Sequence, residues 1–172
     1  MTETRTRILV SAGSKYGATA EIADRIAAVL TEHHFDVDVA APEKVDDVSS
    51  YQAVVLGSAV YAGHWVKSAK NLADRIAVSK PGAGTWLFSS GPIGDPPKPE
   101  EDPVDVADIL NATSARDHRV FSGKIDKSKL SFGEKAILMA VRASEGDYRD
   151  WDAIESWANE IADSLVREVS ER

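Results

Sequence analysis

Cysteine is absent from the 172 residues of the sequence. This absence excludes disulfide bonds, catalysis by a thiolate, zinc sites with cysteine ligands and iron–sulfur clusters. We infer that any redox chemistry of the chain uses a bound organic cofactor.

Basic residues and long apolar runs are also scarce. The chain has 20 lysines and arginines against 28 acidic residues, a formal net charge of −8. A field of this sign repels phosphate backbones, so no nucleic-acid partner is expected. No run approaches the roughly 20 apolar residues that span a bilayer. The apolar stretch at residues 8–10 is too short for a signal-peptide core, so a cytoplasmic protein is expected.

The residues that are present alternate between strand and helix patterns along the whole chain. This alternation predicts an α/β fold, a three-layer doubly wound sandwich, and a single domain over residues 1–172. The pattern fits either flavodoxin-like or Rossmann strand order. The predicted strands cover residues 7–11, 35–40, 53–57, 83–90 and 118–124. The predicted helices cover residues 19–33, 65–79 and 104–113, and a last helix opens at Trp151 and Asp152.

Ligands of such sheets bind beyond the carboxyl ends of the strands, and the segment after the first strand has the character of a phosphate site. Its glycine permits a tight turn, its hydroxyl groups can donate hydrogen bonds, and the following helix directs N–H groups into the same space. The pattern is neither GxxxxGK[ST] nor GxGxxG, which disfavours nucleotide hydrolysis and nicotinamide binding. The alternative is a capped helix after a tight turn. The candidate residues are Ser14, Lys15, Tyr16, Gly17, Ala18 and Thr19.

The segments after the third and fourth strands are candidates for contact with a flat ring. In the second segment, Tyr61 and Trp65 are expected to stack on such a ring. In the third segment, serine hydroxyls and glycines favour ligand binding. The alternative is that this segment only connects a strand to a helix. The candidates are Ala59, Val60, Tyr61, Ala62 and Gly63, together with Ser89, Ser90, Gly91, Pro92 and Gly94.

The histidines and the other tryptophans are interpreted as structural. We expect His64 to make a structural hydrogen bond rather than to act in catalysis, and no catalytic residue can be named. His33 and His34 end a helix, so no metal site is predicted. Trp86 and Trp157 are expected in the core.

Three motifs together carry a family resemblance: SKYGATAEIA, VVLGSAVYAGHW and FSSGPIG. They resemble the flavodoxin-like superfamily. The later stretches VFSGK and GDYRDWD make the chain similar, within that superfamily, to menaquinone-dependent protoporphyrinogen oxidases. The resemblance implies a parallel sheet of order 2-1-3-4-5 and FMN as the cofactor. Residues 14–19 would hold the phosphate, and residues 59–63 and 89–94 would border the isoalloxazine. The implied partners are a quinone or redox protein, with a porphyrinogen as substrate.

A locally basic and apolar segment lies between Lys124 and Arg142. In an acidic protein, such a segment is suited to an anionic membrane surface, a quinone pool or porphyrin propionates. The alternative is a helix that packs its apolar side on the domain and leaves its lysines in water. The sequence leaves both open, including a peripheral location at the inner face of the membrane.

Three functions therefore remain open. The first is an FMN-dependent oxidoreductase of the protoporphyrinogen oxidase type, acting in heme biosynthesis. The second is a flavodoxin-type electron carrier between protein partners. The third is a variant of the fold that binds a deazaflavin, or that binds no flavin and serves as an interaction module.

Overall fold

Apolar strands that are buried on both faces form the centre of the computed structural model. The structure describes residues 5–61, 63–91, 105–125, 128, 131–133, 135–136 and 146–170. Five strands pair in parallel in the order β2-β1-β3-β5-β6. The short β4 (His64–Trp65) pairs antiparallel with the end of β3. The five parallel strands are β1 (Arg7–Gly13), β2 (Asp36–Val39), β3 (Ala53–Tyr61), β5 (Gly84–Gly91) and β6 (Asp117–Ser122).

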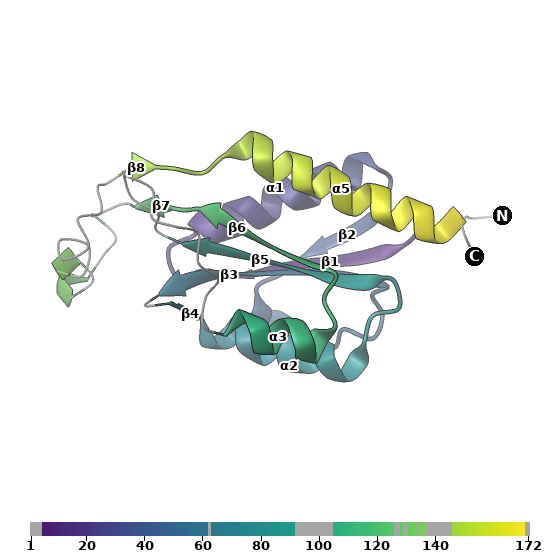
Figure 1. Ribbon diagram of the computed structural model, residues 1–172, viewed down its shortest axis with the longest axis horizontal. Coiled ribbons are helices and arrows are strands. Elements are labelled where there is room, and N and C mark those ends of the chain that lie inside the picture. Colours follow the sequence, from purple (N-terminus) through teal and green to yellow (C-terminus); the bar gives the residue numbers. More distant parts are fainter. Residues whose placement is uncertain are drawn as a thin grey trace.

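Helices cover both faces of this sheet (Figure 1). One face carries α1 (Ala18–Glu32) and α5 (Trp151–Ser170), which also pack against each other. The other face carries α2 (Lys67–Ser79) and α3 (Val106–Thr113). A short 3₁₀ helix, η1 (Pro42–Lys44), follows β2. The two-stranded pair of β7 (Lys124–Ile125) and β8 (Gly146–Asp147) lies at the end of the sheet where the parallel strands finish.

Side chains alternate between two cores, one on each face of the sheet. Phe88, Phe121 and Trp157 meet on the α1–α5 side, with ring centroids 5.7 to 6.1 Å apart. Trp86 is 4% exposed and Trp157 1%, which confirms both as core residues. On the opposite side, the leucines of the strands meet α2 and α3.

The predicted fold class is confirmed, and the order 2-1-3-4-5 holds when β4 is left out of the count. The predicted element ends need correction. The first strand runs on to Gly13, because it keeps its register with β3. The third strand runs on to Tyr61, because it pairs with β5 as far as Ala59 and with β4 as far as Tyr61. Trp65 lies in β4, and the helix predicted from it begins at Lys67. The side chain that caps α5 is Asp150, whose carboxylate accepts the backbone N–H of Ala153 at 3.0 Å.

Across the described residues, no helix is both long enough and apolar enough to cross a bilayer.

Candidate cofactor site

The turn from β1 into α1 leaves the first turn of that helix open to an anion. Gly17 precedes the helix in the left-handed region, at φ 91°, and among the described residues no side chain caps the helix. A Cβ atom added at Gly17 would have no described atom within 4 Å. Backbone N–H groups at the start of a helix bind anions, so this turn fits a phosphate.

Residues 14–19, which we call the phosphate loop after the role predicted for them, differ in the surroundings of their side chains. Ser14 Oγ accepts the backbone N–H of Gly17 at 3.0 Å and so closes the turn, which leaves its hydroxyl proton for another acceptor. Lys15 is exposed and Ala18 is half-buried at the helix start. Thr19 is only 3% exposed, so most of its side chain faces the core.

The second candidate segment begins inside a strand, whereas the sequence analysis placed it after the strand. Ala59, Val60 and Tyr61 are the last residues of β3. Gly63, at φ 82°, makes the turn into β4. Ala62 lies outside the described residues.

The third segment begins inside β5, whose last residues are Ser89, Ser90 and Gly91. Pro92 and Gly94 lie outside the described part of the chain. A Cβ atom added at Gly91 would meet only Val60 Cβ, at 3.8 Å, among the described atoms. As far as the described atoms go, a ligand can therefore approach the backbone at this strand end.

Strand register brings the three segments to one edge of the sheet. Gly13 of β1 lies opposite Ser58 of β3, and Ser58 lies opposite Ser89 of β5. One residue further on, Ala59 pairs with Ser90. We call this the carboxyl edge. It is the position at which ligands of doubly wound folds bind.

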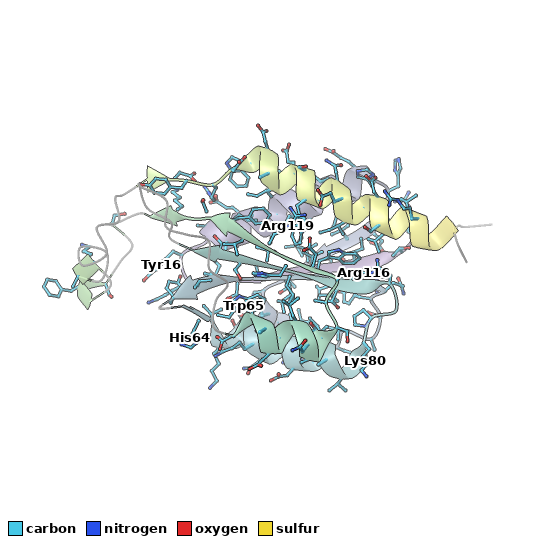
Figure 2. The ribbon with its side chains drawn as sticks, viewed as in Figure 1. Tyr16, His64, Trp65, Lys80, Arg116 and Arg119 are labelled. Atoms are coloured by element: carbon cyan, nitrogen blue, oxygen red, sulfur yellow. The ribbon has the colours of Figure 1, made fainter. Side chains whose placement is uncertain are left out.

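Two tyrosines from different segments meet at the carboxyl edge. The rings of Tyr16 and Tyr61 lie edge to face, with centroids 6.4 Å apart and planes at 80°. The Lys15 ammonium lies over both rings, at 5.2 and 5.9 Å from their centroids. Figure 2 shows Tyr16 and His64 at the same end of the sheet, away from Lys80 and Arg116. This edge therefore offers aromatic surface and the positive charge of Lys15 beside the phosphate loop.

Trp65 does not belong to that aromatic surface, contrary to the expectation that it would stack on a ligand. Its side chain is 3% exposed on the α2–α3 side of the sheet. Its indole N–H donates to Ser89 Oγ at 2.8 Å, and the same oxygen lies 2.7 Å from Nε2 of His118. The hydroxyl of Ser89 is therefore used inside the protein, and Ser90 projects to the other face.

Asp105 anchors the β3–β4 hairpin, and the sequence analysis missed it. Its carboxylate accepts the backbone N–H of Trp65 at 3.1 Å and lies 3.2 Å from His64 Nδ1. Burial alone would raise the pKa of Asp105, but these two hydrogen bonds and the charge of Lys70 lower it below its usual range. His64 thus makes the expected structural hydrogen bond.

The structure places Asp105 directly before α3, where aspartate is common as a cap, whereas the predicted helix 104–113 included it. The structure uses its side chain otherwise, because the described part of α3 has no side-chain cap. Its partner Trp65 lies 40 residues away, so only the fold brings them together.

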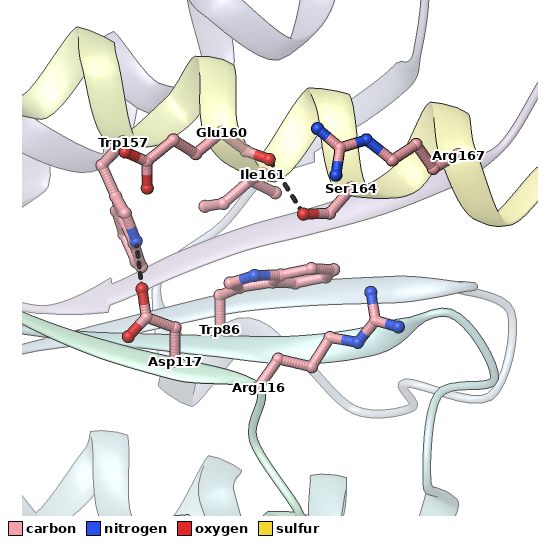
Figure 3. Close-up of a pocket in the computed structure, with 8 residues that line it drawn as sticks. All are labelled: Trp86, Arg116, Asp117, Trp157, Glu160, Ile161, Ser164 and Arg167. Carbon is pink, nitrogen blue, oxygen red and sulfur yellow. Dashed lines mark hydrogen bonds between the residues drawn. The ribbon is translucent and has the colours of Figure 1, made fainter.

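A separate cavity of about 450 Å³ lies between α5 and the amino-terminal parts of β5 and β6 (Figure 3). Its polar lining is largely paired within the protein, since Asp117 accepts the indole N–H of Trp157 and Arg119 bridges Asp117 to Glu160. The cavity is remote from the strand ends, and we place the candidate site at the carboxyl edge instead.

The sequence profile of the flavodoxin domain matches residues 9–152, most of the chain. The chain belongs to the flavodoxin family. A comparison of its sequence with curated proteins finds no significant match. None of the findings supports the narrower resemblance to protoporphyrinogen oxidases.

Solved structures of flavodoxins share this fold. A flavodoxin from the domain Archaea matches with a TM-score of 0.63 at 16% identity, over 93% of this chain and 99% of that one. A flavodoxin of Streptococcus pneumonia TIGR4 matches with 0.62 at 17%, over 95% and 99%. The rubredoxin oxygen:oxidoreductase of Desulfovibrio gigas matches with 0.64 at 13%, over 96% of this chain and 38% of that one. At these identities the likeness shows the fold alone.

Proposed function

We propose that this flavodoxin-family chain binds FMN at its carboxyl edge and serves as an electron carrier between redox proteins. Flavodoxin domains bind FMN. The observation that carries the proposal is the convergence of the open first turn of α1 with the ends of β3 and β5 at one edge. When bound, FMN supplies the electron transfer, while the protein supplies binding, orientation and electrostatics.

The described residues suit the two ends of this cofactor. The backbone N–H groups of the phosphate loop and the hydroxyl of Ser14 would hold the phosphate. The ends of β3 and β5 would border the isoalloxazine, with Tyr16 and Tyr61 as aromatic surface. Ala62, Pro92 and Gly94 remain predicted contacts.

Ala18→Glu tests the phosphate assignment. The substitution places a carboxylate at the first position of α1, where a negative charge stabilises the helix itself. We expect the free energy of unfolding to be unchanged or slightly higher, while FMN affinity falls about tenfold or more, which corresponds to about 1.4 kcal/mol. Fluorescence titration of the apoprotein with FMN measures the affinity.

Ala18→Gln is the matched control, because glutamine has the size of glutamate without its charge. It should keep FMN affinity within about threefold of the original protein, a change below 1 kcal/mol. Equal FMN affinities for the glutamate and glutamine variants would show that the phosphate does not bind at the start of α1.

The electron-carrier proposal is favoured over a quinone-linked oxidase by the family match and by the flavodoxins among the structural neighbours. The support for the oxidase is the sequence resemblance alone. Stopped-flow reduction separates the two functions. We expect fast reduction by a flavodoxin reductase and slow reduction by a menaquinol or a porphyrinogen. Fast turnover from porphyrinogen to quinone would instead establish the oxidase.

Contact of the segment between Lys124 and Arg142 with a membrane stays a prediction. Most of that segment lies outside the described residues. Phe132, which is described, is 90% exposed, and Lys135 is exposed as well. Co-sedimentation with anionic vesicles tests the contact, and no binding would leave a redox protein as the proposed partner.

A further inference from the structure

The Arg149 side chain, between β8 and α5, is charged, 5% exposed and in contact with the first turn of α1. Its Nη1 donates to the backbone carbonyl of Ala18 at 3.2 Å and to Glu21 Oε2 at 2.6 Å. These partners are 131 and 128 residues away in the sequence. A buried arginine is therefore committed to the same turn of helix that we assign to the cofactor phosphate.

Glu21 makes this contact significant for an anionic ligand. It is the acidic residue of the first turn of α1, and its side chain is 58% exposed. A carboxylate there competes with any other anion for the partial positive charge of the helix N-terminus and repels a phosphate directly. Arg149 offsets the charge of Glu21 and fixes the position of its carboxylate.

Arg149 is itself held in a defined position. Its Nε and Nη2 donate to the two oxygens of Asp147 at 2.8 and 2.7 Å, and its guanidinium lies 4.7 Å from the ring centroid of Trp151. The side-chain hydrogen bond from Arg149 lowers the pKa of Asp147, despite partial burial. The hydrogen bond to Asp147 also raises the pKa of Arg149 above its usual range, so the guanidinium stays charged. Only the planar fork of arginine makes this set of bonds.

The same segment continues to the other side of the carboxyl edge. The backbone N–H of Tyr148 donates to the carbonyl of Gly123 at 3.1 Å, and the N–H of Gly123 donates to the carbonyl of Gly91 at 2.8 Å. A Cβ atom at Gly123 would lie 2.8 Å from that Gly91 oxygen, so the approach requires glycine. The segment before α5 thus connects the end of β5 with the start of α1 (Figure 1).

We propose that Arg149 is a positioning residue that keeps the first turn of α1 receptive to phosphate and so makes the site prefer FMN over riboflavin. It acts by neutralising Glu21 and by fixing the carbonyl of Ala18, without itself touching the cofactor. The inference rests on the FMN site proposed above.

The test compares FMN with riboflavin, which has the same ring system and lacks the phosphate. For Arg149→Met, fluorescence titration of the apoprotein should show FMN affinity lowered about tenfold and riboflavin affinity within about twofold of the original protein. Adding Glu21→Gln removes the carboxylate that the first substitution leaves unpaired in the first turn of α1, so the double variant should regain most of the FMN affinity, although Asp147 lacks its partner in both variants. In the apoprotein of Arg149→Met, we also expect faster hydrogen exchange at the first-turn amides of α1.

Arg25→Met is the matched control. Arg25 also lies 4.7 Å from the Trp151 ring and pairs with Glu155 at 2.6 Å, so the variant removes a similar contact with α5. It should leave the ratio of FMN to riboflavin affinity unchanged. If Arg149→Met does not fold, Arg149→Lys takes its place. The ratio of FMN to riboflavin affinity should then fall less, because lysine keeps the positive charge but lacks the planar guanidinium group.

Two results would overturn the inference, and they differ from failure of the proposed function. One is a parallel fall in the affinities of Arg149→Met for FMN and riboflavin, and the other is a fall in FMN affinity that persists in the double variant. Either result would make Arg149 a structural residue only. Failure of the original protein to bind FMN would instead overturn the proposed site, and the inference with it.

Discussion

At the scale of single residues, Gly57 shows how tightly the sheet is packed beneath the proposed site. A Cβ atom at Gly57 would collide with the ring of Phe88. That ring is fully buried against Phe121 and Trp157, so it has no space into which to move. Gly57 is therefore required by packing rather than by its backbone angles.

Gly57→Ala should lower the free energy of unfolding by about 1–3 kcal/mol, the usual cost of overpacking a core. Chemical denaturation measures the change. Gly82→Ala is the control, because a Cβ atom there has no described atom within 4 Å, and its stability should stay within about 0.5 kcal/mol of the original. Equal free energies of unfolding for Gly57→Ala and Gly82→Ala would contradict this account and show that Phe88 moves aside at little cost.

Residue types predicted the phosphate loop but not Arg149 and Glu21, to which we assign its support as a proposal. The sequence marks Gly17 through its turn pattern, and the structure places it directly before α1. Arg149 and Glu21 carry no such mark, because their pairing joins segments 128 residues apart. Likewise, Trp65 is buried with its indole N–H bonded to Ser89, a contact between residues 24 apart in the sequence that its place near Tyr61 does not indicate.

At the scale of elements, the periodicity of side chains predicted which segments are strands and helices, but it placed their ends less well. The third strand continues to Tyr61 because it pairs there with β4, and this short hairpin has no periodic pattern of its own. The start of α2 was displaced for the same reason. Such ends depend on neighbouring strands rather than on local sequence.

The bond between Asp105 and the β3–β4 hairpin predicts how stability depends on pH. The folded-state pKa of Asp105 is lowered, so its contribution to stability is complete above the unfolded pKa of about 4 and is lost as the pH falls through the folded value. Asp105→Asn should therefore lower stability at pH 7 and flatten its decline below about pH 4. Urea denaturation at several pH values measures this dependence.

Asp108→Asn is the matched control, because Asp108 is an exposed aspartate in the first turn of the same helix. It should leave both the stability at pH 7 and its decline in acid close to those of the original protein. A decline in acid that is as steep in Asp105→Asn as in the original would contradict the role of Asp105.

At the scale of the whole molecule, the alternation of strands and helices was enough to predict the layered α/β fold. From the net charge of −8 we expect no nucleic-acid partner, and from the lack of cysteine we expect that any redox chemistry uses a bound organic cofactor. Neither observation distinguishes an electron carrier from an oxidase, since both use the same sheet edge. That distinction depends on which partner reaches the flavin, which the fold itself does not encode.

The central claim is that the carboxyl edge binds FMN, and the most direct measurement is mass spectrometry of the cofactor released from the purified protein. We predict FMN at about one molecule per chain, or stoichiometric uptake when FMN is added to the apoprotein. A deazaflavin as the released cofactor, or a colourless protein that takes up no FMN, would contradict the account.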